Sequence, residues 1–341
     1  MRTLLVHDPG PLATIQDLGR HGRQRFGVAV AGAIDPFAFR AANALVDNPP
    51  DHAAIEFTLA GGQYEIEHGD AHLAVAGGAF ALSIDGRAMA PWRSFVLRPG
   101  ERLTVGGAPD AARGYLAVDG GFDVPPVLGS RSTHVRSGIG GWQGRALRSG
   151  DRLPAGAPRP PGGGDRVLPA DAIPAKASVV RMVLGPQDDH FDPPAIAAFF
   201  AATYTVTREA DRMGYRLEGP PIAHAGNDNI VSDGIALGSV QIPGNGLPII
   251  LLADRQPTGG YPKIGTVIGP DLRAIAQARP GDTVRFQRID RAPAHRARVE
   301  WQMRLDGIPA AVRAGEEGDR YDSRRLLTLN LVSGVIAEGE L

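Results

Sequence analysis

The sequence predicts a mainly β protein built from two β-barrel-like domains with a few short helices. Short runs with β-branched or aromatic residues at alternate positions recur along the chain. Gly, Asp or Pro separates most of these runs, as in tight turns. The chain also has 45 glycines and 29 prolines, which favours many turns. A barrel arrangement is favoured because closure removes the exposed edges of so many short strands.

The first half of the chain is expected to hold eight strands, at residues 3–8, 53–59, 63–68, 71–77, 80–85, 94–98, 102–107 and 113–120. One helix interrupts them, where Asp35 and Pro36 precede the segment FAFRAANALVD. This pattern gives an N-cap, a proline in the first turn and apolar residues at helical spacing. We interpret Asp35 as that N-cap rather than as a catalytic acid.

We expect the chain to divide into four segments. They are an N-terminal β domain (1–153), a Pro/Gly-rich linker (154–177), a C-terminal β-barrel domain (178–290) and a charged C-terminal extension (291–341). The linker assignment depends on PAGAPRPPGGG at residues 154–164. In the extension, we expect a helix at 300–305, a solvated charged run at 313–325 and a strand at 326–336.

The second half repeats the β pattern. Its expected strands lie at residues 178–185, 201–207, 215–219, 238–244, 247–254, 264–269 and 282–289, and its expected helices at 193–202 and 271–278. RPGERLTV (98–105), RSGDRLPA (148–155) and RPGDTVRF (279–286) share one order of base, Gly, acid and strand. This echo indicates either a common tight turn or two similarly built β domains.

Composition excludes several functions. The 36 basic and 37 acidic residues nearly cancel, which gives no electrostatic case for binding nucleic acid. The absence of cysteine excludes thiol nucleophiles and disulfides and fits a cytoplasmic protein. No apolar run is long enough for a signal peptide or a membrane span, so we expect a soluble protein with no membrane partner. Signatures for a phosphate loop, a zinc helix and a serine elbow are absent, and no metal site is expected.

Polar, glycine-containing turns remain unexplained by apolar patterning. They lie at residues 10–28, 32–36, 129–133, 185–191, 211–219, 232–246 and 252–267. Each can be an ordinary turn, in which glycine allows positive φ and Asp caps the backbone. Together, their clustered Arg, Lys, Gln and Asp side chains favour the walls of one polar pocket.

The residue types of these turns suggest a chemistry. Arg212, Arg255 and Lys263 can hold a carboxylate or phosphate oxygen, and backbone N–H groups at a glycine pair can stabilise an oxyanion. Aspartates can act as bases or orient an amide N–H. Two plainer alternatives stay open: Arg255 and Lys263 can form ordinary salt bridges with Asp254 or another acid, and Asp17 can be a turn cap.

Five segments carry a resemblance to a known family: GPLATIQDLGRHG, GAIDPFAFRAANALVDN, GGFDVPPVLGSRST, DRMGYRLEGP and ILLADRQPTGGYPKIGTV. They resemble the biotin-dependent carboxyltransferase family, also called allophanate hydrolase subunit 2, KipI antagonist or the 5-oxoprolinase C subunit. The resemblance runs from about residue 4 to 290. It implies cyclophilin-like β-barrel domains and a partner from the subunit 1 (KipI-like, 5-oxoprolinase B subunit) family, with the active site near the shared interface. The chain lacks a serine amidase signature, which puts allophanate hydrolysis in doubt.

Carrying the family motifs over residue by residue, and adding the chemistry above, gives two sets of candidates. The expected catalytic residues are Asp17, Asp233, Asp254, Arg255 and Lys263. The expected substrate-binding residues are Gln16, Arg20, Arg212, Gln241, Gly259, Gly260 and Tyr261. We expect these side chains to converge on one cleft that binds an anionic ligand with an amide group.

The leading functional hypothesis is a subunit, inactive alone, of a cytoplasmic ATP-dependent 5-oxoprolinase that converts 5-oxo-L-proline to L-glutamate. A subunit 1 partner and a third subunit would complete it, and the complex would bind the ATP. One alternative is a carboxyltransferase subunit acting on urea or a related amide; its biotin would come from another protein, because no A-M-K-M acceptor is present. The other is a regulatory binding module that antagonises a kinase inhibitor.

Overall fold

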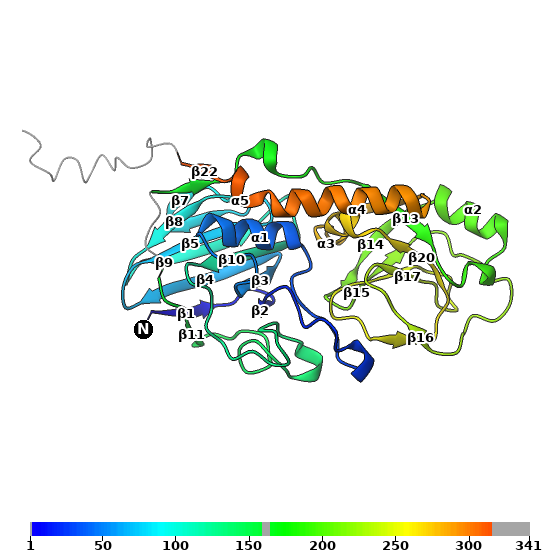
Figure 1. The fold of residues 1–341 in the computed structure, drawn as a ribbon, viewed down its shortest axis with the longest axis horizontal. Helices are drawn as coiled ribbons and strands as arrows, with labels where there is room; N and C mark the ends of the chain where they lie inside the picture. The colour runs from blue at the N-terminus through cyan, green and yellow to red at the C-terminus, as the bar shows by residue number, and fades with distance from the viewer. Residues whose placement is uncertain (1, 159–163, 316–341) are drawn as a thin grey trace, which may run out of the picture.

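Two antiparallel sheets make up the N-terminal part of the protein in a computed structural model that describes residues 2–158 and 164–315 (Figure 1). The six-stranded sheet has the order β11 (Arg152–Pro154), β1 (Thr3–Asp8), β4 (Ala60–Glu67), β9 (Arg102–Gly107), β6 (Leu82–Ile84) and β7 (Arg87–Met89). The five-stranded sheet has the order β2 (Ala13–Gln16), β3 (Ala54–Thr58), β10 (Arg113–Val118), β5 (Ala71–Ala76) and β8 (Ser94–Leu97).

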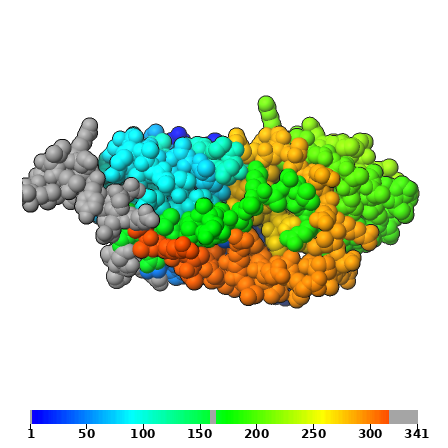
Figure 2. Space-filling model, turned by 90° about the horizontal axis from the view of Figure 1, so that it is seen from above, coloured from blue at the N-terminus to red at the C-terminus, as the bar shows by residue number. Residues whose placement is uncertain are grey.

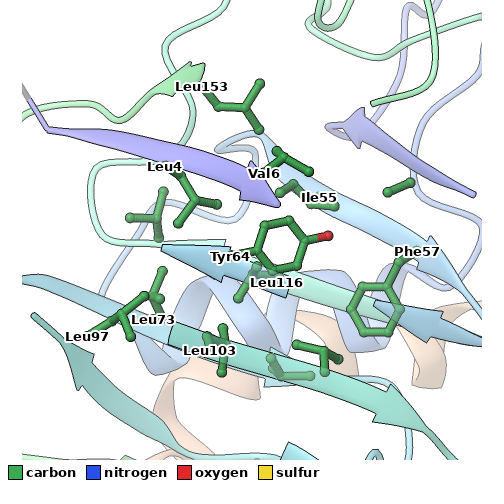
Figure 3. Packing of buried hydrophobic residues seen from close by; sticks show 14 of the residues in the cluster. Leu4, Val6, Ile55, Phe57, Tyr64, Leu73, Leu97, Leu103, Leu116 and Leu153 are labelled. Atoms are coloured by element: carbon green, nitrogen blue, oxygen red, sulfur yellow. The ribbon is translucent and has the colours of Figure 1, made fainter. Parts of the chain in front are cut away.

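An apolar core lies between these two sheets (Figure 3). Successive side chains of a strand point to opposite faces, so Leu4 and Val6 of β1 are buried while their neighbours are partly exposed. They pack with Tyr64 of β4 and with Leu116 of β10 from the facing sheet. Burying each such side chain stabilises the fold by about 1.5–3 kcal/mol.

The C-terminal part closes into a seven-stranded barrel. Its order is β13 (Val179–Leu184), β20 (Lys263–Val267), β17 (Ser239–Gln241), β18 (Ile249–Leu251), β15 (Gly214–Glu218), β14 (Thr203–Ala210) and β21 (Thr283–Arg288). The ring closes through a parallel pairing of β13 with β21, whereas the other barrel pairings are antiparallel. A second apolar core fills it. A two-stranded ribbon of β16 (Asp233–Gly234) and β19 (Thr258–Gly259) lies at one end.

Helix α1 (Pro36–Leu45) covers the outer face of the five-stranded sheet. This explains why β10 is buried along its whole length: Leu116 faces the core between the sheets, and Tyr115 faces the helix. Asp35 precedes the helix as its N-cap, and its carboxylate accepts from the N–H groups of Phe37 and Ala38, each at 3.1 Å. The N-cap prediction is therefore confirmed.

Helix α4 (Arg291–Asp306) joins the two parts of the molecule. It contacts β13 of the barrel and α1 of the N-terminal part, and α5 (Ile308–Ala311) continues it along α1. Figures 1 and 2 show this orange segment running across the junction. Leu305 and Ile308 are buried there. The remaining short elements are η1 (Gln24–Phe26), η2 (Val135–Ser137), β12 (Arg166–Val167), η3 (Ala170–Ala172), η4 (Asp188–His190), α2 (Pro193–Ala201), η5 (Gly269–Asp271), α3 (Leu272–Ala276) and β22 (Arg313–Ala314).

The mainly β prediction, with barrel architecture and few short helices, is confirmed. The barrel-like expectation takes two forms, a closed ring in the C-terminal part and two facing sheets in the N-terminal part. The extension differs from expectation, because its helix starts at Arg291 and packs against both parts. Residues 316–325 of the expected charged run and the expected strand at 326–336 lie outside the described residues. The four segment boundaries stay a prediction.

Candidate functional site

A buried network of charged side chains lies where the barrel meets the N-terminal sheets. Arg212, between β14 and β15, donates from Nε and Nη2 to the two carboxylate oxygens of Asp254, each at 2.9 Å. Its Nη1 donates to Glu56 of β3, and Nη2 also donates to the carbonyl oxygen of Gly32 at 2.8 Å. All three charged residues are buried. Because its N–H groups are engaged by protein acceptors, the geometry favours a role for Arg212 in joining the two parts.

Glu56 is the centre of this network. Its second carboxylate oxygen accepts from the hydroxyl of Tyr115 at 2.8 Å and from the N–H of Ile34 at 3.0 Å. Burial acts to raise the pKa of Glu56, but Arg212 first, and then Arg113 and these hydrogen bonds, hold that pKa below its ordinary value. Glu56 is thus an anion, and Arg212 is its main counter-charge.

The barrel side of the network extends to the residues around α3. Gln277 donates to the carboxylate of Asp35 at 2.8 Å and also bonds the backbone N–H and carbonyl of Arg113 at 3.0 and 3.1 Å. The Nε of Arg273 lies 3.2 Å from the same carboxylate. Asp35 therefore caps α1 with one oxygen and contacts the barrel with the other.

Asp17 lies on the loop after β2, in a different group. Its carboxylate accepts from four donors, which are the N–H groups of Gly19 and Arg131 and the hydroxyls of Ser130 and Ser132. Both of its oxygens are engaged, so the geometry favours Asp17 as an anchor for residues 130–132 over proton abstraction. The hydrogen bond from the N–H of Gly19, two residues later, is the one expected if Asp17 caps a turn.

Gln16 and Arg20 surround this anchor. Gln16 donates to the carbonyl oxygen of Thr133 at 3.1 Å and accepts from the N–H of Gly32 at 3.1 Å. Arg20 is 1% exposed, and its Nη1 has no partner among the described residues. Burial lowers the pKa of Arg20, while the charges of Asp17 and Asp254 oppose that change. The charge of Asp254 in the junction network therefore acts on Arg20 of the loop after β2.

A third group lies at the end of the barrel, beside the β16–β19 ribbon. Lys263 of β20 donates to the carboxylate of Asp233 at 2.9 Å, and Gln187 donates to the same oxygen at 3.1 Å. The Lys263 side chain is only 3% exposed, whereas that of Asp233 is 50% exposed. Hydrogen bonds from Lys263 and then Gln187 lower the pKa of Asp233. Lys263 thus forms a salt bridge with an acid, as one of the two interpretations of this residue expected.

The glycine pair after Thr258 has a different cause from the expected positive φ. Neither Gly259 nor Gly260 has a left-handed backbone. A Cβ on Gly259 would lie 2.7 Å from Ile235 Cδ1 and 3.0 Å from Gln241 Nε2, so the ends of these two side chains would have to move to admit one. A Cβ on Gly260 would meet nothing nearer than 3.4 Å. The Gln241 amide donates to the carbonyl oxygen of Tyr261 at 3.3 Å, beside this pair.

Arg255 is a buried cation whose hydrogen-bond partners are neutral carbonyl oxygens. It follows Asp254 in the chain, but its Nε donates to the carbonyl oxygen of Ile235 and its Nη1 to that of Leu252, each at 3.1 Å. In the described part of the chain, no carboxylate lies within ion-pair distance of it, and it is 5% exposed. Burial lowers the pKa of Arg255 to about 10, so it stays charged at neutral pH. An anionic ligand would offset the cost of burying this charge.

The structure thus sorts the predicted residues into three groups. Arg212 and Asp254 lie in the junction network, and Gln16, Asp17 and Arg20 lie on the adjacent loop. Lys263, Asp233, Gln241, Gly259, Gly260 and Tyr261 lie around the ribbon, where Arg255 reaches them through Ile235. Two hollows among the described residues, of about 270 and 250 Å³, are lined by other residues. Convergence of all three groups on one cleft stays a prediction.

Most of the chain, including the junction network and the residues around the ribbon, matches a known family. The family model described as the carboxyltransferase domain, subdomain A and B, matches residues 26–288. The chain belongs to this family. The resemblance drawn from the five motif segments is therefore confirmed.

Relatives within the carboxyltransferase family span most of this chain. It is 37% identical over 302 residues to the 5-oxoprolinase C subunit of Escherichia coli (strain K12), which covers 86% of this chain and 93% of the relative. It is 36% identical over 300 residues to the 5-oxoprolinase C subunit of Haemophilus influenzae, covering 87% and 94%. The crystal structure of K. lactis urea amidolyase matches 92% of this chain with a TM-score of 0.84 and 28% identity, but this chain spans only 20% of that protein.

Sequence reasoning missed several residues that hold these groups in place. Glu56 interrupts the apolar run AAIEFTL, and a carboxylate inside a buried strand is a signal for a charged partner. Ser130, Ser132 and Gln187 lie in turns that the sequence did single out, at 129–133 and 185–191. Tyr115 carried no such signal, because an aromatic residue in a strand is ordinary core.

Two further features concern the described residues as a whole. No group of three or more His, Asp or Glu side chains there is arranged to hold a metal ion. None of the described helices combines the length and the apolar character needed to cross a membrane.

Proposed function

We propose that this chain is the C subunit of a cytoplasmic, ATP-dependent 5-oxoprolinase, which opens the lactam of 5-oxo-L-proline to L-glutamate. The observation that carries the proposal is the similarity to the 5-oxoprolinase C subunit over 93% of the Escherichia coli relative. The chain acts with a subunit 1 (KipI-like, 5-oxoprolinase B subunit) partner and a third subunit, and it is inactive alone. ATP is bound by the complex, and we assign no residue of this chain to it.

The group around the β16–β19 ribbon suits this chemistry. In the net hydrolysis, water gives its hydroxyl to the lactam carbonyl carbon and a proton to the ring nitrogen, and the C–N bond between them breaks. The substrate carries a carboxylate, and the reacting carbonyl oxygen gains negative charge. Arg255 provides a positive charge without a neighbouring carboxylate to neutralise it. We therefore assign Arg255 to binding the negative charge of the substrate.

Neighbouring side chains would complete the substrate contacts. The Gln241 amide can bond the lactam, because it offers both a donor and an acceptor. Asp233 is half-exposed and is held by Lys263, which suits a group that orients the ring N–H or passes a proton to it. Asp17 and Asp254 were the other expected catalytic acids; we propose that they position the loops that carry this group.

The carboxyltransferase reading is supported by the structural similarity to urea amidolyase, with its TM-score of 0.84. In that reaction, a carboxyl group would move from carboxybiotin, held on another protein, to an amide nitrogen of urea or a related compound. The same cation and the same amide-binding side chains would serve it. The two functions therefore differ in the donor and the acceptor, and activity assays separate them.

Reconstitution tests the proposal. The chain is co-expressed with its subunit 1 partner and the third subunit, and glutamate released from 5-oxo-L-proline with ATP is measured. Arg255→Ala should lower kcat/KM by at least about 100-fold, since it removes a charge used in a desolvated site. The substitution strands no carboxylate but removes a buried side chain and its two hydrogen bonds to backbone carbonyls, so Tm and complex assembly are measured beside activity. A loss of turnover in a variant that still folds and assembles reports the lost charge. Activity within threefold of the parent would remove Arg255 from the site.

A matched glycine pair tests the same site without changing charge. Gly259→Ala should displace the ends of Ile235 and Gln241, because its Cβ would lie within 3.0 Å of both. We expect a fall in kcat/KM of about tenfold, as for a small displacement of a substrate-positioning group. Gly260→Ala is the control, because its Cβ finds space. Equal effects of the two changes would contradict a site at Gln241.

The remaining outcomes identify the alternatives. Turnover of urea that requires bicarbonate, ATP and a biotinylated carrier, with no glutamate from 5-oxo-L-proline, would favour the carboxyltransferase. Tight binding of the subunit 1 partner with no turnover in either assay would favour the regulatory binding module.

A further inference from the structure

Two loops concentrate positive charge in a chain that is otherwise balanced. Residues 18–28 contain three arginines and residues 124–150 contain four, with no Asp or Glu inside either segment. Asp123 and Asp151, which flank the second segment, pair with Arg131 and Arg145. Among the described residues, the exposed arginines of these segments without an ion pair are therefore Arg23, Arg25, Arg136 and Arg148. The whole chain, by contrast, has 36 basic and 37 acidic residues. We call these two segments the arginine loops.

The arginine loops are tied together at their bases and project on the same side. Arg20 of the first loop donates to the carbonyl oxygens of Ser132 and, at 3.4 Å, of Val127 in the second. Asp17, just before the first loop, accepts from Ser130 at 2.7 Å. In Figure 1, η1 (blue) and η2 (blue-green) both extend toward the edge of the molecule at which β16 lies.

The tip of the first loop is held by local hydrogen bonds. The N–H groups of Phe26 and Gly27 donate to the carbonyl oxygens of Arg23 and Gln24, each at 2.9 Å, which forms the single turn η1. A Cβ placed on Gly27 would meet nothing within 4 Å, so the turn stands away from the body of the protein. Local hydrogen bonds therefore preform a projecting surface, which lowers the entropy lost on binding.

Apolar side chains stand exposed among these arginines. Phe26 is 64% exposed, Leu128 48% and Val135 44%. The guanidinium of Arg25 lies 4.8 Å from the centroid of the Phe26 ring. Within the described residues, neither Arg23 nor Arg25 takes part in an ion pair. Arginine and aromatic side chains are the types enriched in the centres of protein interfaces.

We propose that the arginine loops are the surface that docks the subunit 1 partner. On that partner, an acidic patch would surround an apolar pocket that receives Phe26. This inference rests on the proposed function, because it names the surface by which the proposed complex assembles. A protein fits this surface better than a nucleic acid, because Phe26, Leu128 and Val135 lie exposed among the arginines and a phosphate backbone offers them no apolar contact. The partner would then stand beside the edge that carries the β16–β19 ribbon.

The test measures the Kd between the full-length chain and its purified subunit 1 partner. Arg23→Glu/Arg25→Glu should weaken binding at least about 30-fold, and Phe26→Ala about tenfold. Raising the salt concentration should weaken binding of the parent more than that of the double variant, because fewer attractive charges remain to be screened. The control is Arg285→Glu/Arg288→Glu, an equal charge reversal at exposed positions of β21, which should keep the Kd of the parent.

The outcomes separate this inference from the proposed function. If the parent binds its partner and the complex releases glutamate, but the loop variants keep the parent Kd within twofold, the docking surface is wrong and the function stands. If the β21 control weakens binding as much as the loop variant, the effect is one of net charge, and the surface is again wrong. If the parent does not bind the partner at all, both proposals fall. Circular dichroism confirms that each variant is folded.

Discussion

Asp254 and Arg255 are neighbours in the chain, but their side chains enter different surroundings. Asp254 receives two bonds from Arg212 in the junction network, whereas Arg255 reaches the carbonyl oxygen of Ile235 beside the ribbon. That these two charged residues have a specific role could be predicted from the polar turn in which they lie. Their partners could not, because Arg212 lies 42 positions away from Asp254 and Glu56 lies 156 positions away from Arg212. One short turn thus contributes both to the contact between the two parts and to the candidate site.

Glu56 gives a prediction for acid stability. Its folded pKa is below the ordinary value of 4.5, so its ionised form stabilises the fold above that pH, and this contribution is lost as the pH falls below about 4.5. Glu56→Gln should lower the free energy of unfolding at pH 7 by about 3–5 kcal/mol, because it leaves Arg212 with fewer counter-charges. It should also flatten the decline between pH 5 and pH 3. Urea denaturation at a series of pH values measures both effects.

The control for this prediction is a carboxylate on the surface. Glu67 pairs with Arg152 at 3.3 Å and its side chain is 24% exposed. Glu67→Gln should change stability by less than about 1 kcal/mol at pH 7. A Glu56→Gln variant as stable as the Glu67→Gln variant would contradict the assignment of Glu56 as a buried anion.

At the scale of elements, the repeated base–Gly–acid pattern proves to be one turn used three times. In each copy the N–H of the arginine donates to the side chain of the acid three residues later, at Arg98, Arg148 and Arg279. The N–H of that acid donates back to the arginine carbonyl oxygen, and the glycine between them has a positive φ. Local hydrogen bonds define such a turn, which is why sequence alone identifies it.

Elements without a local pattern could not be predicted. The strands β16 and β19 are two residues long, too short to show alternation, and they exist because each pairs with the other. Strands with clear alternation, such as β1, were expected at the positions observed. Helix α4 was only partly foreseen because its apolar pattern is weak, and its position depends on packing with α1. Tertiary contacts thus decide both the ribbon beside the candidate site and the position of α4.

A prediction follows for helix α4. Leu305 is 6% exposed in the cluster that joins α4 and α5 to α1, whereas Met303, two residues earlier, is 70% exposed. Leu305→Ala should lower the free energy of unfolding by about 2–5 kcal/mol through lost burial and a residual cavity. Met303→Ala should change it by less than about 0.5 kcal/mol. Urea denaturation of both variants measures the difference, and equal midpoints would show that α4 does not contribute packing energy here.

The whole molecule is held together by the junction network and by α4, both of which connect the facing sheets to the barrel. The sequence predicts the two β parts because each has its own alternation and its own turns. It does not predict how they dock, because that depends on a buried carboxylate in one part meeting a buried arginine in the other. The docking brings the loop after β2 against the turn at residues 252–255, where the N–H of Ala31 donates to the carbonyl oxygen of Ala253 at 3.2 Å.

Arg212→Leu should uncouple the two parts. The change leaves Glu56 and Asp254 buried without their shared counter-charge, which costs about 3–5 kcal/mol at the junction rather than inside either core. Tryptophan fluorescence reports the N-terminal part and α4, because residues 179–288 contain no tryptophan, whereas far-UV circular dichroism reports all strands. In the parent protein, the two probes should give one coincident urea transition. In Arg212→Leu their midpoints should separate.

Arg216→Leu is the control, because Arg216 is on the surface with a side chain 55% exposed. Coincident transitions in Arg212→Leu, at a midpoint like that of the control, would mean that α4 and the apolar contacts alone join the barrel to the sheets.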